Sequence, residues 1–109
     1  MKNSSDEKIL EEANLWINAN HKVALATVIK TWGSSPRQVG SKMIVNEKGE
    51  FWGSISGGCV ESSVIDESLQ LIKENKPFKK IELKVSNENA WEVGLACGGA
   101  ITIYLEQIN

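Results

Sequence analysis

The stretch KVALATVIK, residues 22–30, is almost continuously apolar between its terminal lysines, and it is rich in β-branched side chains. An apolar run of this length and composition is typical of a strand in the interior of a sheet. We therefore predict an interior strand over residues 22–30. A chain of 109 residues suits one domain built around one core, so the other elements are expected to pack around this strand.

The residues before this strand, NSSDEKILEEANLWINANH (3–21), predict an amphipathic helix. Ser4 followed three residues later by Glu7 fits a capping box at its start. Asn20 and His21 close it. Apolar residues recur at helical spacing and predict one buried face, which consists of Ile9, Leu10, Ala13, Trp16 and Ile17.

The residues after the strand predict five more elements. The loop TWGSSPRQVG (31–40) is followed by SKMIVNEKGEFWGSI (41–55), which is typical of a hairpin with NEKG as its turn. A second helix is expected from about Gly58 to Asn75, with Pro77 as its stop. Strands are expected at 78–86, where polar and apolar residues alternate, and at 100–107, with a loop over 87–99 between them.

This order of elements predicts the fold class. A helix, three strands, a second helix and two strands indicate an α+β (or α/β) domain. We expect a single layer of mixed sheet with about five strands, and two helices packed on it.

Composition and charge exclude several classes of function. The chain is 41% hydrophobic and 24% charged, with a net charge of −2 and a pI of about 5.4. No basic patch stands out, so we expect no nucleic-acid partner. The apolar runs are too short to span a membrane, and MKNSSDEKIL lacks the apolar segment of a signal peptide. We therefore expect a cytoplasmic protein whose two cysteines stay reduced.

The segment GSISGGCVESSV (53–64) places Cys59 between two glycines and a predicted helix. A helix start has unpaired N–H groups and partial positive charge, so it suits an anion and favours a reactive thiolate. Glu61 in the same turn could accept from a ligand N–H, or could simply be an acid favoured by the helix dipole. The alternative for Cys59 is that Gly57 and Gly58 make a tight turn and the thiol fills a small space.

Two more loops carry candidate binding residues. In WGSSPRQVGS (32–41) Pro36 fixes the backbone before Arg37, whose guanidinium suits a phosphate or a carboxylate, although a surface turn is the simpler interpretation. In GLACGGA (94–100) Cys97 precedes a glycine pair. Two cysteines and one histidine do not make a zinc set, and their spacing is not that of a redox motif. His21, at a helix end, is interpreted as a capping or surface residue and not as a base.

Together, these loops resemble the N-terminal domain of the XdhC/CoxI family, the xanthine dehydrogenase accessory factors. The matching stretches are GSSPRQVGSKMIV (33–45), GSISGGCVE (53–61) and GLACGGAITIYLE (94–106), in the order found in the family. The resemblance covers roughly residues 24–106 and implies one such domain over residues 1–109. Many members carry a Rossmann-type domain after this one. Because the sequence ends at Asn109, we expect that domain to be absent from this chain.

The resemblance implies a molybdenum cofactor chaperone and not a catalyst. Such a protein binds the cofactor as cargo, protects it, and delivers it to the apoenzyme of a xanthine dehydrogenase-type molybdenum hydroxylase. No catalytic residue and no metal ligand is assigned. The cofactor contacts carried over by position are Ser34, Ser35, Arg37, Gly57, Gly58, Cys59, Glu61, Cys97, Gly98 and Gly99.

Two other functions stay open at this point. Cys59 could carry sulfur as a persulfide received from a cysteine desulfurase, although no general base can be assigned to assist it. Cys59 and Cys97 could instead form a reversible disulfide, which requires their Cα atoms to lie within about 7 Å. A homodimer is a further hypothesis, since it would close an open pocket on a small domain.

Overall fold

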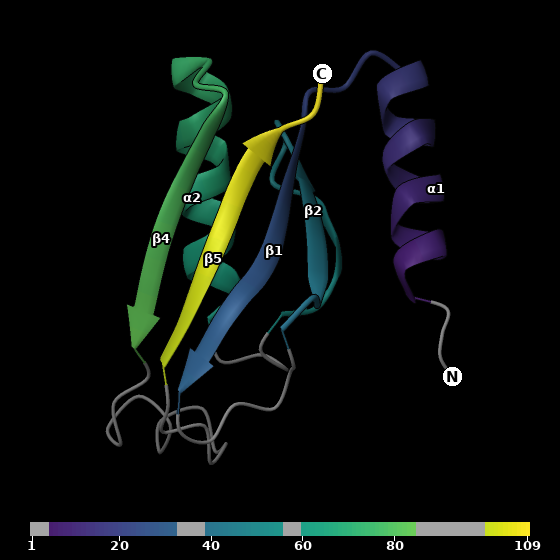
Figure 1. The fold of residues 1–109 in the computed structure, drawn as a ribbon. Helices are drawn as coiled ribbons and strands as arrows, with labels where there is room; N and C mark the ends of the chain where they lie inside the picture. Colours follow the sequence, from purple (N-terminus) through teal and green to yellow (C-terminus); the bar gives the residue numbers. More distant parts are fainter. Residues whose placement is uncertain (1–4, 33–38, 56–59, 85–99) are drawn as a thin grey trace.

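The computed structural model describes residues 5–32, 39–55, 60–84 and 100–109, which form two helices and five strands (Figure 1). The predicted capping residue Ser4 and the predicted loop 87–99 lie outside these residues. In chain order the elements are α1 (Ser5–Asn18), β1 (Val23–Trp32), β2 (Lys42–Asn46), β3 (Phe51–Gly53), α2 (Glu61–Glu74), β4 (Phe78–Lys84) and β5 (Ala100–Gln107).

The five strands form one sheet in the order β3-β2-β1-β5-β4. The prediction of five strands and two helices is confirmed, and β1 lies in the interior as expected. The expectation of a mixed sheet is wrong, because every pair of neighbouring strands is antiparallel. Strand direction depends on how the chain returns to the sheet: α2 carries the chain across to β4 at the far edge, and β5 then inserts between β4 and β1.

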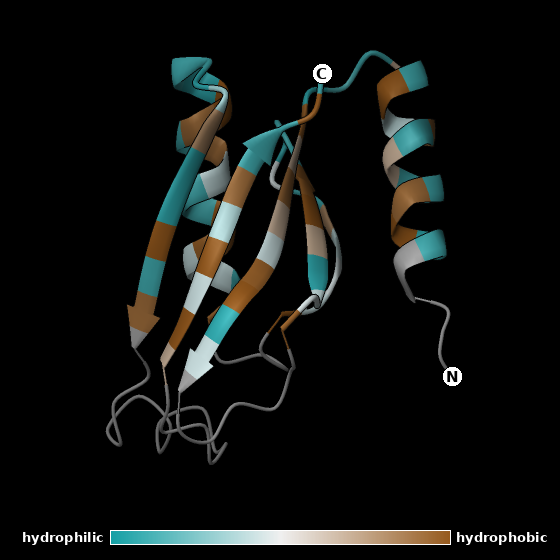
Figure 2. Ribbon diagram, in the orientation of Figure 1, coloured by the Kyte–Doolittle hydropathy of each residue, from teal (hydrophilic) through white to brown (hydrophobic). Residues whose placement is uncertain are grey.

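Each face of the sheet is covered by one helix. Successive side chains of a strand point to opposite faces, so Ala24 and Ala26 face α2 while Val23 and Leu25 face α1. Figure 2 shows the same alternation of hydrophobic and hydrophilic residues along β4 and β5. The cluster on the α1 side contains Ile9, Ala13, Val23, Leu25 and Ile44. The larger cluster on the α2 side contains Ala24, Ala26, Val28, Met43, Val45, Ile55, Val60, Val64, Leu71, Ile81, Ile101, Ile103 and Leu105.

Three boundaries or faces differ from the sequence predictions. Leu10 was expected in the buried face of α1 but is 52% exposed, because α1 packs mainly over β1, β2 and β3 and buries a narrow stripe. α2 begins at Glu61 and not at Gly58, since Val60 has a non-helical backbone with φ −130° and ψ 11°. β1 continues to Trp32, where it pairs with Ala100, a partner 68 positions later in the sequence.

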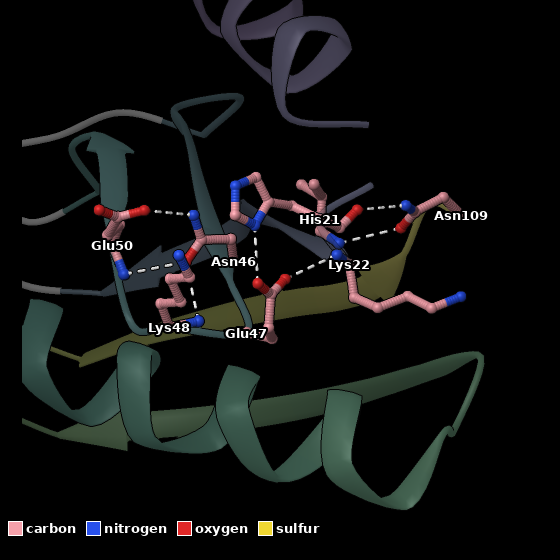
Figure 3. A network of polar contacts seen from close by, with 8 residues as sticks. His21, Lys22, Asn46, Glu47, Lys48, Glu50 and Asn109 are labelled. Atoms are coloured by element: carbon pink, nitrogen blue, oxygen red, sulfur yellow. Dashed lines mark hydrogen bonds and ion pairs between the residues drawn. The ribbon is translucent and has the colours of Figure 1, made fainter. Parts of the chain in front are cut away.

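The hairpin turn between β2 and β3 is fastened by the buried side chain of Asn46. Its Oδ1 accepts hydrogen bonds from the backbone N–H groups of Lys48 (2.9 Å) and Glu50 (3.1 Å). Its Nδ2 donates to the Glu50 carboxylate at 2.8 Å (Figure 3). The predicted turn NEKG is therefore confirmed, with Gly49 N–H donating to Asn46 O at 2.9 Å.

The same end of the sheet is closed by a second polar network (Figure 3). Glu47 accepts from the backbone N–H of Lys22 (2.7 Å) and bonds His21 Nδ1 (2.7 Å). The hydrogen bond with the His21 side chain holds the pKa of Glu47 below its ordinary value. Desolvation opposes this shift, and the Lys22 amide adds a smaller lowering. Asn109 bonds the backbone on both sides of Lys22, at His21 O (2.7 Å) and Val23 N (2.9 Å).

Candidate functional site at the loop end of the sheet

The end of the sheet opposite this polar network is where the predicted binding loops begin and end. Trp32 pairs with Ala100, and Ala100 pairs with Lys84. These three residues therefore form one row across β1, β5 and β4. Segment 33–38 follows Trp32 directly. Segment 85–99 follows Lys84 and is followed by Ala100, so it leaves from this row and returns to it. Figure 1 shows the three strand ends side by side.

The third predicted loop starts at the same end. β2 begins at Lys42, which pairs with Thr27, so β2 enters the sheet from the side toward which β1 extends. β3 is antiparallel to β2, and Gly53 pairs with Met43. The chain therefore returns to that end with Ser54 and Ile55, and α2 begins there at Glu61 (Figure 1). We call this end, defined by Trp32, Lys42, Ile55, Glu61, Lys84 and Ala100, the loop end.

Among the predicted cofactor contacts, the structure describes Glu61. Whether the two thiols meet, and what the other contacts touch, stay predictions. The remaining ones lie outside the described residues: Ser34, Ser35, Arg37, Gly57, Gly58, Cys59, Cys97, Gly98 and Gly99.

Glu61 binds its own chain across the glycine pair. Its Oε2 accepts a hydrogen bond from Ser54 Oγ (3.0 Å) and another from the backbone N–H of Ile55 (3.1 Å). Sequence reasoning treated Glu61 as a ligand acceptor or a dipole-favoured acid and missed this internal role. The available signal was the spacing: a serine and an acid seven residues apart, on either side of Gly57-Gly58, can meet if the chain reverses between them.

The first turn of α2 lacks the usual side-chain cap. Helices commonly begin with Ser, Thr, Asp or Asn, whose oxygen accepts from the first-turn amides. Val60 occupies this position and makes no side-chain cap hydrogen bond. Its side chain is instead buried in the larger hydrophobic cluster, on the α2 side of the sheet. The helix dipole at this end is complemented by Glu61 in the first turn.

A bulge in β1 supports the other side of the loop end. The register between β1 and β5 shifts between Val28 and Lys30. Val28 donates to Ser41 O (2.9 Å) and accepts from Gly40 N (2.8 Å), so the chain that returns from segment 33–38 is tied to the bulge. Lys42 Nζ also bonds Gly40 O at 3.0 Å. Bulges of this kind recur beside functional sites, where they redirect the chain.

The part of the chain that the structure describes offers no metal centre, since no three His, Cys, Asp or Glu side chains gather there. His21 lies with Glu47 at the end of the sheet remote from the loops. Among the described helices, none has the length and apolar character needed to cross a lipid bilayer.

The fold and the loop end define a small α+β domain that presents glycine-rich connections from one end of an antiparallel sheet. The chain belongs to the XdhC and CoxI family, whose sequence profile matches residues 16–82. The predicted family is thereby confirmed, and the matched residues include the first two of the three stretches, 33–45 and 53–61.

Individual relatives agree with this assignment. The chain is 36% identical to YqeB of Escherichia coli (strain K12) over 97 residues, which is 89% of this chain. It is 32% identical over 77% of its length to the molybdenum cofactor insertion chaperone PaoD of the same organism. It is also similar to a solved structure of a xanthine dehydrogenase from Bacillus halodurans, with a TM-score of 0.79 and 28% identity over 97% of this chain.

All of these relatives are longer proteins. The chain spans 18% of YqeB, 26% of PaoD and 31% of the Bacillus halodurans chain. The similarity therefore describes one domain of each relative.

Proposed function

We propose that this domain binds molybdenum cofactor as cargo in the cytoplasm and acts as an accessory chaperone for a xanthine dehydrogenase-type hydroxylase. In this role it would protect the cofactor and deliver it to the apoenzyme. Two findings support the proposal: membership of the XdhC and CoxI family, and 32% identity to a relative named as a molybdenum cofactor insertion chaperone.

The observation that carries the proposal is the shared origin of the three loops at the loop end. Trp32, Lys84 and Ala100 are neighbours across the sheet, and Ser54 and Ile55 arrive at the same end. Segments with the family motifs thus begin and end close together, although they are far apart in sequence. The contacts we propose are Ser34, Ser35, Arg37, Gly57, Gly58, Cys59, Glu61, Cys97, Gly98 and Gly99.

The chemistry of the cargo suits these residue types. The cofactor combines a phosphate-bearing pterin with a metal held by sulfur. Arg37 can pair with a phosphate through two parallel hydrogen bonds. The start of α2, where Val60 supplies no side-chain cap, is an environment that favours an anion. The thiol of Cys59 is a soft ligand that suits a transition metal or a sulfur-handling step.

The experiment is cofactor uptake by the purified chain. We expect nearly stoichiometric uptake of cofactor released from a molybdoenzyme, measured as pterin fluorescence after oxidation. Arg37→Ala should weaken binding by about 10–100-fold, the effect of losing hydrogen bonds between charged groups. Lys22→Ala is the matched control, because it also removes one positive charge but lies at the remote end of the sheet.

Two results would count against the proposal. Absence of uptake by the wild-type chain would reject it outright. Wild-type affinity in both Cys59→Ala and Cys97→Ala would remove the thiols from the site, and equal loss in Arg37→Ala and Lys22→Ala would indicate non-specific attraction of an anion.

A further inference from the structure

We propose that two copies of this chain associate edge to edge through β4, with the two strands antiparallel and centred on Ile81. β4 forms one edge of the sheet, and β5 is its only neighbouring strand among the described residues (Figure 1). It has seven residues, whereas β3 at the opposite edge has three. A long edge strand presents a row of backbone groups to which another strand can bind. The inference goes beyond the proposed function and does not depend on it.

Alternate residues of β4 direct their backbone groups away from the sheet. Gln107 N–H donates to Pro77 O at 3.0 Å. In an antiparallel pair, residues joined by hydrogen bonds alternate with residues that are not. Counting from Pro77 along the strand, the backbone groups of Ile81 therefore point toward β5. Those of Lys80 and Glu82 point toward the open edge, where they can bind a second strand.

Charge favours the register centred on Ile81 over its neighbours. This register pairs all seven residues of β4 and sets Lys80 of each copy opposite Glu82 of the other. Both side chains are exposed, and neither forms an ion pair with another described residue. Opposite charges at facing positions stabilise a strand pair, and like charges destabilise it. A shift of the centre to residue 80 or 82 would set two identical charges against each other.

Lysines on an edge strand commonly prevent pairing, and β4 contains three of them. The Nζ of Lys79 is bonded to Glu67 of α2 at 2.6 Å, so its charge is already balanced within one copy. The charge of Lys80 is balanced by Glu82 when a second copy is present. This arrangement of lysine and acid permits self-association and opposes pairing with a strand that lacks the same pattern.

Both helices leave this edge accessible. α1 packs mainly against β1, β2 and β3, and α2 packs mainly against β1, β2 and β5. Phe78, at the start of β4, is 58% exposed and stacks on Tyr104 with the ring centroids 5.8 Å apart. A second β4 strand would cover part of the Phe78 ring, which adds apolar burial to the backbone hydrogen bonds.

The inferred dimer keeps the two candidate sites apart. Because the paired strands are antiparallel, Lys84 at the loop end of one copy lies opposite Phe78 of the other. The two loop ends therefore lie at opposite ends of the shared sheet. The sequence-based reason for expecting a homodimer was that it would close an open pocket, and the pairing inferred here does not do so.

The first measurement is sedimentation velocity of the chain over a concentration series from about 1 μM to about 1 mM, which covers the association of interfaces of modest area. Lys80→Glu and Glu82→Lys should each weaken dimerisation about tenfold or more, because each change makes both facing pairs repulsive. The control Lys48→Glu makes the same change of charge in the exposed turn between β2 and β3, and it should leave dimerisation unchanged. Far-ultraviolet circular dichroism checks that each variant is folded.

Restoring the facing charges gives the sharper test. The double variant Lys80→Glu/Glu82→Lys exchanges the two charges within one chain, so it should dimerise with about wild-type affinity. An equimolar mixture of the two single variants should form a mixed dimer, because positions 80 and 82 then carry opposite charges across the two chains. Each single variant alone should stay largely monomeric at the same concentration.

Hydrogen exchange locates the contact on β4. The amides of Lys80 and Glu82 point toward the open edge, so their exchange should slow about fivefold or more as the dimer forms. The Ile81 amide is bonded to β5 within one copy, and its exchange should change by less than about twofold over the same concentrations.

Three results would overturn the inference. One is a wild-type chain that sediments as a monomer throughout the concentration series. Another is a dimer that forms equally well in both single variants, or single variants that fail to associate with each other when mixed. The third is exchange at Lys80 and Glu82 that does not depend on concentration while the chain dimerises, which would place the contact on another surface.

Discussion

Gly53 and Gly40 provide a matched test of how tightly the loop end is built. Both have positive φ angles, +96° and +98°, which L side chains rarely adopt. Each lies within one of the stretches that match the family, Gly40 in 33–45 and Gly53 in 53–61. Their surroundings differ. A Cβ on Gly40 would have no atom of the described residues within 4 Å, whereas a Cβ on Gly53 would lie 2.6 Å from the backbone oxygen of Lys42 and 3.0 Å from Ile9 Cδ1.

The expected magnitudes follow from this difference. A left-handed backbone costs an L residue about 1–2 kcal/mol, so Gly40→Ala should lose that amount of unfolding free energy. Gly53→Ala has the same strain and also overfills the site. The clash is with the backbone of β2, which pairs with both β1 and β3, so it cannot be relieved by rotating a side chain. Overpacking of this kind adds about 1–3 kcal/mol, for a total of about 2–5 kcal/mol.

Urea and thermal denaturation followed by far-ultraviolet circular dichroism would measure both values. For a domain of this size, each kcal/mol lowers the midpoint of thermal unfolding by about 4–8 °C. The extra 1–3 kcal/mol should therefore lower the midpoint of Gly53→Ala by about 4–24 °C more than that of Gly40→Ala. Equal destabilisation of the two variants, within about 0.5 kcal/mol, would refute the reasoning. It would show that backbone strain alone decides the cost and that β3 does not approach β2 as closely as described.

Two further predictions concern Glu47 and Ser68. The pKa of Glu47 is lowered from its ordinary value of 4.5, chiefly by the bond to His21, so its contribution to stability is present above about pH 4.5 and is lost as pH falls through the lower folded-state value. Urea unfolding near pH 7 should therefore show that Glu47→Gln is less stable than wild type. Because the pair is exposed, we expect a difference of under about 1 kcal/mol. A difference that stays constant down to pH 3 would contradict this prediction. Ser68 is fully buried and its Oγ has no hydrogen-bond partner in the described structure, so Ser68→Ala should stabilise the domain by about 1 kcal/mol. The exposed Ser63→Ala on the same helix controls for helix propensity, and a loss of stability in Ser68→Ala relative to it would be the opposite result.

Local sequence patterns predicted the elements of this fold well. The run 22–30 lies in the central strand, and NEKG forms the turn. The alternation in FKKIELKVS predicted the edge strand β4, which the structure describes over Phe78–Lys84 with Ile81 buried and Glu82 exposed. These features depend on residues that are neighbours in sequence, so short-range rules suffice for them.

The predictions that were wrong concern features that depend on contacts between residues far apart in the sequence. The antiparallel direction of β5 and the extension of β1 to Trp32 both follow from pairing with residues about 70 positions away. The exposure of Leu10 depends on how much of the sheet α1 covers. The site shows the same limit: the residue types of the loops were readable, but the bonds from Ser54 and Ile55 to Glu61 require a chain reversal that spacing alone does not specify.

The two ends of the sheet are held in different ways, and this difference bears on function. At one end Asn46, Glu47 and Asn109 satisfy backbone groups with ordinary polar side chains. At the loop end, Val60 stands where a capping residue is expected, directly after Gly57-Gly58-Cys59. The valine at the cap position and the glycine pair before it both depart from what helix formation alone favours. Departures of this kind concentrate at functional sites, because stability is supplied by the rest of the fold. Here the rest of the fold includes buried Ile55 and Val60 on either side of the segment, so the glycines and the thiol are free to be selected for a ligand.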